Sequence, residues 1–155
     1  MKLRLEVRHN TEARAEIEKL KNARTFVGWF GNLKYDDNTA VAQVASEQEF
    51  GTNKIPARPF MRPARNKNFN KWTNILKYNL QTTHNVSQSL DALAMVVEGD
   101  IRQAIVDVTE PPLSPITIQR RKARYRTQKF TASITKPLID TGLMITSVSH
   151  KTEAK

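Results

Sequence analysis

The sequence contains no cysteine, and glycine is scarce, with only 5 among 155 residues. The lack of cysteine excludes a disulfide scaffold and every cysteine-ligated zinc site, and it fits synthesis in a reducing compartment such as the cytoplasm. No segment approaches the roughly 18 consecutive apolar residues that a membrane-spanning helix needs. The N-terminus also lacks the continuous apolar stretch of a secretory signal peptide. We therefore expect a soluble protein that does not contact a membrane.

Acidic side chains are missing from two long parts of the chain. Residues 50–90 carry seven basic side chains and residues 111–139 carry another seven, and neither block contains an acidic one. Residues 91–110 show the reverse balance, with five acidic side chains and one basic. Two interpretations remain open. Basic faces can meet acidic faces of the same or a neighbouring subunit, or they can contact nucleic-acid phosphates.

Motifs that indicate catalysis are weak in this chain. The three histidines show no metal-ligand spacing: His9, His84 and His150. Asp140-Thr-Gly142 matches the core triplet of retroviral-type aspartic proteases, in which two subunits share a proton between their aspartates. However, Leu143 and Met144 follow where those proteases need a small residue, and there is no glycine-rich flap.

The favoured alternative for this triplet is a turn. In it, Asp140 or Thr141 caps the next helical turn and Gly142 relieves steric strain. We expect a protein that is not an enzyme and that needs no cofactor, metal or small-molecule substrate.

Hydrophobic periodicity predicts one α+β domain over residues 1–155, with a small mixed sheet packed on several helices. Expected strands cover Leu3, Leu5 and Val7 near the N-terminus, residues 25–30, and the C-terminal segment up to His150. One expected helix is short, is capped by Asn10 or Thr11 and runs through about Asn22. Others run from Thr39 to a stop at Gly51, and onward from Pro63. The clearest pattern is a long amphipathic helix at about 87–108, whose apolar residues lie within about 120° on a helical wheel.

Two segments read as arms outside the core. Residues 51–63 form a proline-rich connector arm, in which each proline fixes its own φ and pushes the preceding residue out of the helical region. A stiff, apolar and basic connector is unlike a flexible linker, so we expect it to be held against another surface. Residues 111–137 form a basic extended arm that orders on assembly, with a short helix from Ser114 or Pro115 to about Ala123.

Three segments in this order resemble the tail-completion, or head–tail connector, proteins of tailed bacteriophages. The first is the helix end Glu49-Phe-Gly-Thr52 followed by Ile55-Pro-Ala-Arg-Pro-Phe-Met-Arg-Pro-Ala64. The second is Pro111-Pro-Leu-Ser-Pro-Ile-Thr-Ile118, and the third is Lys136-Pro-Leu-Ile-Asp-Thr-Gly-Leu-Met-Ile-Thr-Ser147. The likeness spans roughly residues 39–150, and its first segment is the most distinctive.

This resemblance implies a non-enzymatic structural subunit of the phage neck, made in the host bacterial cytoplasm and located in the virion. Members of the family form rings, commonly hexameric, between the head portal or adaptor proteins and the tail tube or tail terminator proteins. The family's proline–arginine–phenylalanine element falls here on seven residues: Ile55, Pro56, Arg58, Pro59, Phe60, Arg62 and Pro63. The stretch 120–136 is longer and richer in arginine than the corresponding arm of such proteins.

From these observations we expect a subunit or partner interface formed by Ile55, Pro56, Arg58, Pro59, Phe60, Met61 and Arg62. Phe60 and Met61 would be its apolar anchors, and Arg58 and Arg62 would pair with the acidic face of a neighbour's 87–108 helix. Candidate nucleic-acid or partner-facing residues are Arg120, Arg121, Arg124 and Arg126. The expected partners are other copies of the chain and the head and tail proteins, with passing contact to genome DNA. The alternative function is a basic nucleic-acid-binding module.

Overall fold

The computed structural model describes residues 11–128 and 132–153, and the predicted α+β class is confirmed in these ranges. The elements follow the order α1 (Thr11–Asn22), β1 (Arg24–Gly28), α2 (Val41–Phe50), α3 (Met61–Thr83), α4 (Val86–Asp107), α5 (Pro115–Gln128), α6 (Leu143–Thr146) and β2 (Ser149–Glu153). The expected strand at Leu3, Leu5 and Val7 lies outside the described residues. No helix within the described ranges has the length and apolarity to cross a lipid bilayer.

The sheet consists of β1 and β2, which pair in antiparallel register from Arg24 opposite Glu153 to Gly28 opposite Ser149. Thr25 and Val27 are half-buried, whereas Phe26 between them is exposed. This alternation is expected of a strand that packs on a core with one face only. The buried face lies against α4, and among the described residues the other face is exposed.

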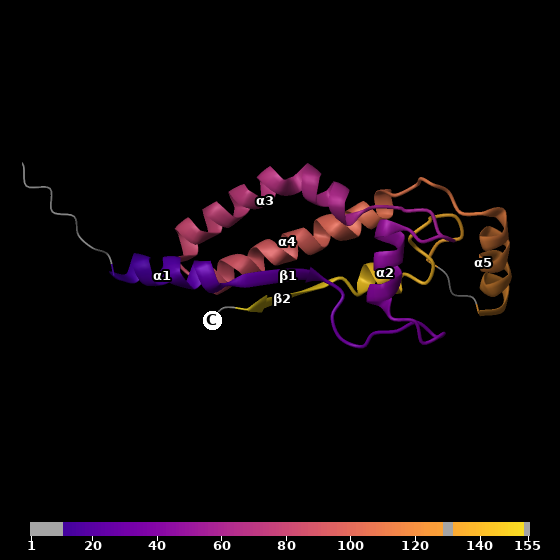
Figure 1. Cartoon of the computed structure of the whole chain (residues 1–155), viewed down its shortest axis with the longest axis horizontal. Helices are drawn as coiled ribbons and strands as arrows, with labels where there is room; N and C mark the ends of the chain where they lie inside the picture. The colour runs from indigo at the N-terminus through magenta and orange to yellow at the C-terminus, as the bar shows by residue number, and fades with distance from the viewer. Residues whose placement is uncertain (1–10, 129–131, 154–155) are drawn as a thin grey trace, which may run out of the picture.

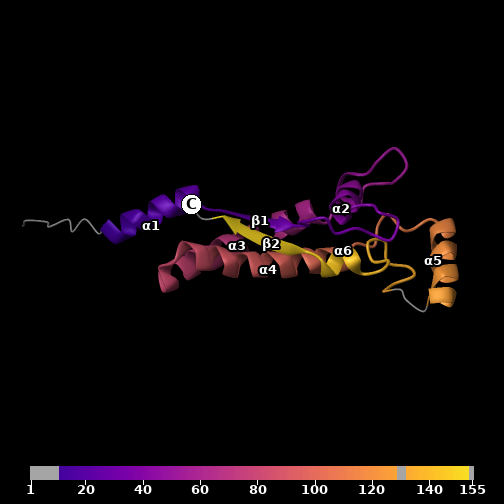
Figure 2. The same ribbon diagram turned by 90° about the horizontal axis from the view of Figure 1, so that it is seen from below.

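The long amphipathic helix is confirmed as α4. Its N-terminus is capped by Asn85, whose side-chain oxygen accepts the backbone N–H of Gln88 at 3.0 Å. The buried residues recur at helical spacing, namely Leu90, Ala94, Ile101 and Ile105. α3 and α4 lie side by side and form the long body of the molecule (Figures 1 and 2).

The acidic side chains of α4 are used within the subunit. Asp100 accepts hydrogen bonds from the Lys71 ammonium at 2.7 Å and from the Trp72 indole N–H at 2.7 Å, both on α3. Glu98 accepts a hydrogen bond from Arg102 at 2.9 Å and lies 2.6 Å from the ring Nδ1 of His150 on β2. Basic and acidic parts of the chain therefore meet inside one subunit, which was one of the two open interpretations.

The core lies toward the end of the body where α2, α6 and the start of α3 converge on α4. Its most completely buried apolar side chains are Val41, Phe60, Ile105 and Val148. Figure 1 shows an elongated molecule with α1 at one end and α5 at the other. The functional segments singled out in the sequence, the 51–63 connector and the 111–137 arm, both lie at the α5 end.

Candidate assembly site

The connector between α2 and α3 is held in place by a buried carboxylate. Glu49, only 3% exposed, accepts the backbone N–H groups of Phe60 at 2.7 Å, Met61 at 2.9 Å and Arg62 at 3.1 Å. These are the free donors at the start of α3, whose N-cap residue Phe60 offers no side-chain cap. Glu49 thus acts as a cap supplied from the preceding helix, and it also neutralises the positive end of the helix dipole.

The side chain of Arg62 completes this arrangement. Its Nε donates to Glu49 Oε1 at 2.9 Å and its Nη2 donates to the Glu49 backbone carbonyl at 3.0 Å. Burial on its own would raise the pKa of the Glu49 carboxyl, but the backbone donors and Arg62 outweigh it and hold that pKa below its ordinary value. Glu49 is therefore ionised in the folded protein.

Gly51 makes the sharp turn between α2 and the connector. Its φ is +76°, and a Cβ at this position would lie 2.8 Å from the backbone nitrogen of Ala57. Only glycine fits here, because both the positive φ and the close backbone approach exclude a side chain. The predicted helix stop at Gly51 is confirmed.

Arg58 is buried, which corrects the expectation that it pairs with a neighbouring subunit. Its guanidinium donates from Nε to the Pro111 carbonyl at 2.7 Å and from Nη2 to the Pro112 carbonyl at 3.0 Å. A third bond, from Nη1 at 3.2 Å, reaches the side chain of Gln48. With 5% of its surface exposed, Arg58 ties the connector to the segment that follows α4. The planar fork of arginine suits two adjacent carbonyls in a way that lysine does not.

Phe60 is also not the surface anchor that we expected. It is 1% exposed and meets the ring of Trp29 edge to face, with 5.8 Å between ring centroids. The indole N–H of Trp29 in turn donates to the carbonyl of Met144 at 2.8 Å. Phe60 therefore joins the connector to the core at the end of β1 and at α6.

The rest of the connector remains at the surface. Pro56, Pro59 and Arg62 are exposed, and Ile55 and Met61 are half-buried. Next to them, Phe50 is 65% exposed, and the Arg62 guanidinium carbon lies 4.9 Å from its ring centroid. We call Phe50, Ile55, Pro56, Pro59 and Arg62 the connector patch. Phe50 belongs to the motif at the end of α2, but nothing in the local sequence marks it as the most exposed aromatic residue of this region.

The helix of the basic arm is longer than expected, because α5 runs from Pro115 to Gln128 and not only to about Ala123. Arg121, 7% exposed, anchors α5 by donating to backbone carbonyls at 2.7–3.2 Å, those of Ser133, Lys136, Pro137 and Ile139. Its Nε lies 3.5 Å from the carboxylate of Asp140, which also pairs with Arg124. Burial lowers the pKa of Arg121, and the charge of Asp140 partly offsets this effect.

Consequently, two of the four candidate basic residues are engaged within the subunit. Arg121 is buried and Arg124 is engaged by Asp140, whereas Arg120 and Arg126 are exposed on α5. The exposed side of this helix also carries Tyr125, with 47% of its surface accessible.

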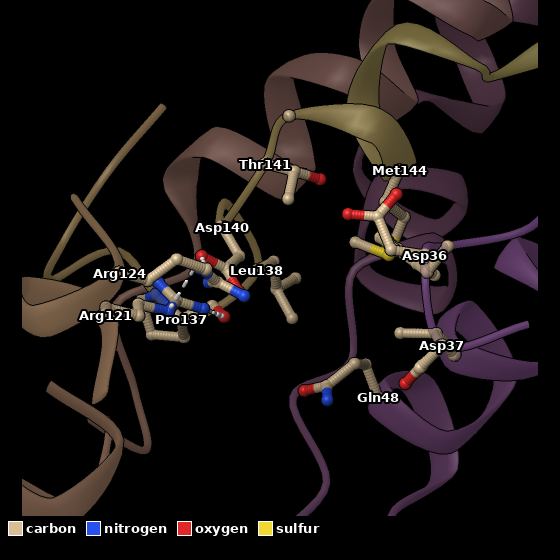
Figure 3. A pocket seen from close by; sticks show the side chains of 13 residues that line it. Asp36, Asp37, Gln48, Arg121, Arg124, Pro137, Leu138, Asp140, Thr141 and Met144 are labelled. Carbon is tan, nitrogen blue, oxygen red and sulfur yellow. Dashed lines mark hydrogen bonds and ion pairs between the residues drawn. The ribbon is translucent and has the colours of Figure 1, made fainter. Parts of the chain in front are cut away.

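A polar pocket of about 350 Å³ lies beside this anchor, between the 35–37 loop, α2, α5 and residues 137–144. In Figure 3, Arg121, Arg124 and Asp140 gather on one wall, and Asp36, Asp37 and Gln48 form the other. The described residues that line it include no histidine or cysteine, and the described ranges hold no group of three or more ligands that could bind a metal ion. The arginines are already bound to carbonyls and to Asp140, so the arrangement acts as a structural clamp on α5.

The Asp140-Thr-Gly142 triplet forms the predicted capping turn. The Thr141 hydroxyl accepts the backbone N–H of Leu143 at 3.2 Å, and Gly142 has a φ of +84°. Because Asp140 is engaged with two arginines, the turn offers no support for the protease alternative.

Comparison with known proteins adds no further constraint, since no family model, curated protein or solved structure matches this chain.

Proposed function

We propose that this chain is a non-enzymatic structural subunit of a tailed-phage neck, which assembles into a ring between the head connector and the tail tube. The observation that carries the proposal is the connector patch. Its backbone is fixed at both ends by Glu49 and Arg58, yet it presents Phe50 and two prolines to solvent. A rigid, exposed apolar and arginine-containing surface is typical of a protein–protein interface.

The wider surface supports the same proposal. Large apolar side chains are exposed on several elements, among them Phe26 on β1, Phe69 and Tyr78 on α3, and Met95 on α4. A single exposed apolar residue needs no explanation, but exposure along the whole length of an elongated molecule suits a subunit that is covered on several sides. Heterologous contacts between such subunits repeat until a ring closes.

The test locates the chain in the particle. Purified virions of the phage that encodes this chain are labelled with gold-conjugated antibody against it and viewed by electron microscopy. The proposal expects label at the junction of head and tail. Virions that contain no copy of the chain would rule out a neck subunit, and label confined to the capsid or the distal tail would rule out the joining role.

The nucleic-acid-binding alternative is supported by the exposed Arg120, Tyr125 and Arg126 on α5, because basic and aromatic side chains together suit a phosphate backbone and its bases. A neck ring surrounds the path of the genome, so a weak contact of this kind is compatible with the structural role.

A further inference from the structure

One edge of the small sheet is unpaired. β1 hydrogen-bonds to β2 on one side, and within the described ranges no backbone hydrogen bond joins its other edge to another element. Such an edge offers a row of N–H and C=O groups to an additional strand. Since a two-stranded sheet is at most marginally stable alone, a third strand would strengthen it.

An apolar groove of about 330 Å³ borders this free edge. It is lined by Thr25 and Val27 from β1, by Met61, Arg62, Arg65 and Trp72 from α3, and by Val97 and Ile101 from α4. The cross-strand partners of Thr25 and Val27, which are Thr152 and His150, do not line it. The groove therefore lies on the side of β1 that faces away from β2, where an added strand would cover it.

We infer that residues 2–8 of a neighbouring copy occupy this edge as a third strand. In that segment Leu3, Leu5 and Val7 alternate with the charged residues Lys2, Arg4, Glu6 and Arg8. Because successive side chains of a strand point to opposite faces, the three apolar side chains face the groove while the charged ones face water. This inference rests on the proposed ring and names the contact that closes it.

The geometry of α1 favours a neighbour over the same chain. α1 has 12 residues, so it is about 18 Å long, and a single residue separates it from β1. Both views show α1 continuing away from the sheet, past the ends of α3 and α4 (Figures 1 and 2). Thr11, the first residue of α1, therefore lies about 18 Å from the end of that helix next to β1.

Ten extended residues reach at most about 33–36 Å, so a return along α1 would leave about half of them to pair with their own strand. To reach β1 of a neighbouring subunit, the segment does not have to run back along α1. The described side chains of α1 are exposed, including Glu18, Lys19 and Leu20, as expected of an element that projects toward a neighbour. Exchange of this arm from each subunit to the next is a head-to-tail contact, which generates a closed ring when the rotation between neighbours closes.

Disulfide trapping on the full chain tests the inference, and the absence of native cysteine removes any background. An affinity-tagged Leu5→Cys variant is mixed with untagged Thr25→Cys or Val27→Cys protein, allowed to assemble, and oxidised. We expect a covalent tagged–untagged dimer with both groove-facing partners. Phe26→Cys, on the opposite face of the same strand, is the matched control and should give at least tenfold less product.

Native mass spectrometry of the same samples records the oligomer mass. Together the two measurements distinguish failure of the exchanged arm from failure of the ring. If the ring forms but the mixed variants do not cross-link, or the Leu5→Cys/Val27→Cys double variant cross-links only within one chain, the exchanged arm is overturned and the ring stands. If neither ring nor cross-link forms, both fail. A second variant, Leu5→Glu, should dissociate the ring, whereas Arg4→Gln, with the same change in charge on the outer face, should leave it intact.

Discussion

The carboxylate of Glu49, at the end of one helix, accepts the backbone N–H of Phe60, which opens the next, at 2.7 Å. The two residues are eleven positions apart, and most of the proline-rich connector lies between them. This single contact caps α3, orders the connector and seats the Phe60 ring in the core. It explains why a segment with the composition of a surface arm has a fixed conformation in one subunit.

The first prediction concerns the stability that this cap provides. Glu49→Ala should lower the free energy of unfolding by about 2–4 kcal/mol, because three backbone donors and Arg62 lose their buried acceptor. Chemical denaturation followed by circular dichroism measures the change. Glu47→Ala is the matched control, because Glu47 lies on the same helix and its carboxylate accepts a side-chain hydrogen bond from Gln43. This variant should change stability by less than about 0.5 kcal/mol. Equal losses in the two variants would contradict the capping role.

The second prediction is the pH dependence of this stabilisation. The pKa of Glu49 is held below its ordinary value of about 4.5 in the folded state, so the unfolded chain binds the proton more readily. The stabilisation is therefore complete above the unfolded pKa and is lost as the pH falls through the lower, folded pKa. The stability gap between wild type and Glu49→Gln should be constant near neutral pH and should narrow below about pH 4.5. A gap that widened in acid would have the wrong sign for this account.

The third prediction assigns Arg58 to folding and not to a partner. Arg58→Lys keeps the charge but cannot reach the Pro111 and Pro112 carbonyls with one planar fork, and it should cost about 1.5–3 kcal/mol of stability. Thermal or chemical unfolding measures this loss. Arg65→Lys, on an exposed position of α3, is the matched control and should be close to neutral. A stable Arg58→Lys protein that failed only in assembly would restore the surface role.

The fourth prediction compares two phenylalanines at the ends of the connector. Phe60→Ala should destabilise the subunit by about 3–5 kcal/mol because it empties a fully buried site against Trp29. Phe50→Ala should change stability by less than about 1 kcal/mol but weaken assembly at least tenfold, since the ring is 65% exposed within the connector patch. Unfolding curves and sedimentation measure the two effects. An assembly affinity unchanged by Phe50→Ala would remove the connector patch from the interface.

The fifth prediction addresses nucleic acid. Arg120 and Arg126 are exposed on α5, and each can neutralise one phosphate. The purified protein should therefore bind duplex DNA weakly, with a slope of log affinity against log salt concentration near −2. Arg120→Gln/Arg126→Gln should remove most of this slope, whereas Arg65→Gln should not. Tight binding at 200 mM salt with a much steeper slope would favour the nucleic-acid-binding alternative over a structural subunit.

Local patterns in the sequence were sufficient for the elements whose causes are local. The apolar stripe of α4, the glycine stop of α2 at Gly51 and the Thr141–Gly142 turn each depend on residues within a few positions of one another. These features were predicted and are confirmed.

The parts that could not be predicted depend on partners distant in the sequence. Arg58 donates to carbonyls that are 53 and 54 residues away in the sequence. Arg121 donates to carbonyls that are 12–18 residues away, on the other side of a loop. An arginine beside prolines looks the same in sequence whether it faces solvent or a pair of buried carbonyls. The absence of acidic residues near these arginines in the sequence suggested partners outside the subunit. Their acceptors are backbone carbonyls, which are uncharged and which every residue carries, so the pattern of charged side chains does not reveal them.

The central claim is that the chain assembles into a closed ring, and electron microscopy of the purified wild-type protein tests it most directly. Class averages are collected from full-length protein with its particle mass checked against multiples of 17.7 kDa. We predict closed rings with a central channel and about six subunits, joined head to tail. Monomers at micromolar concentration, or two-fold dimers with no channel, would contradict the account.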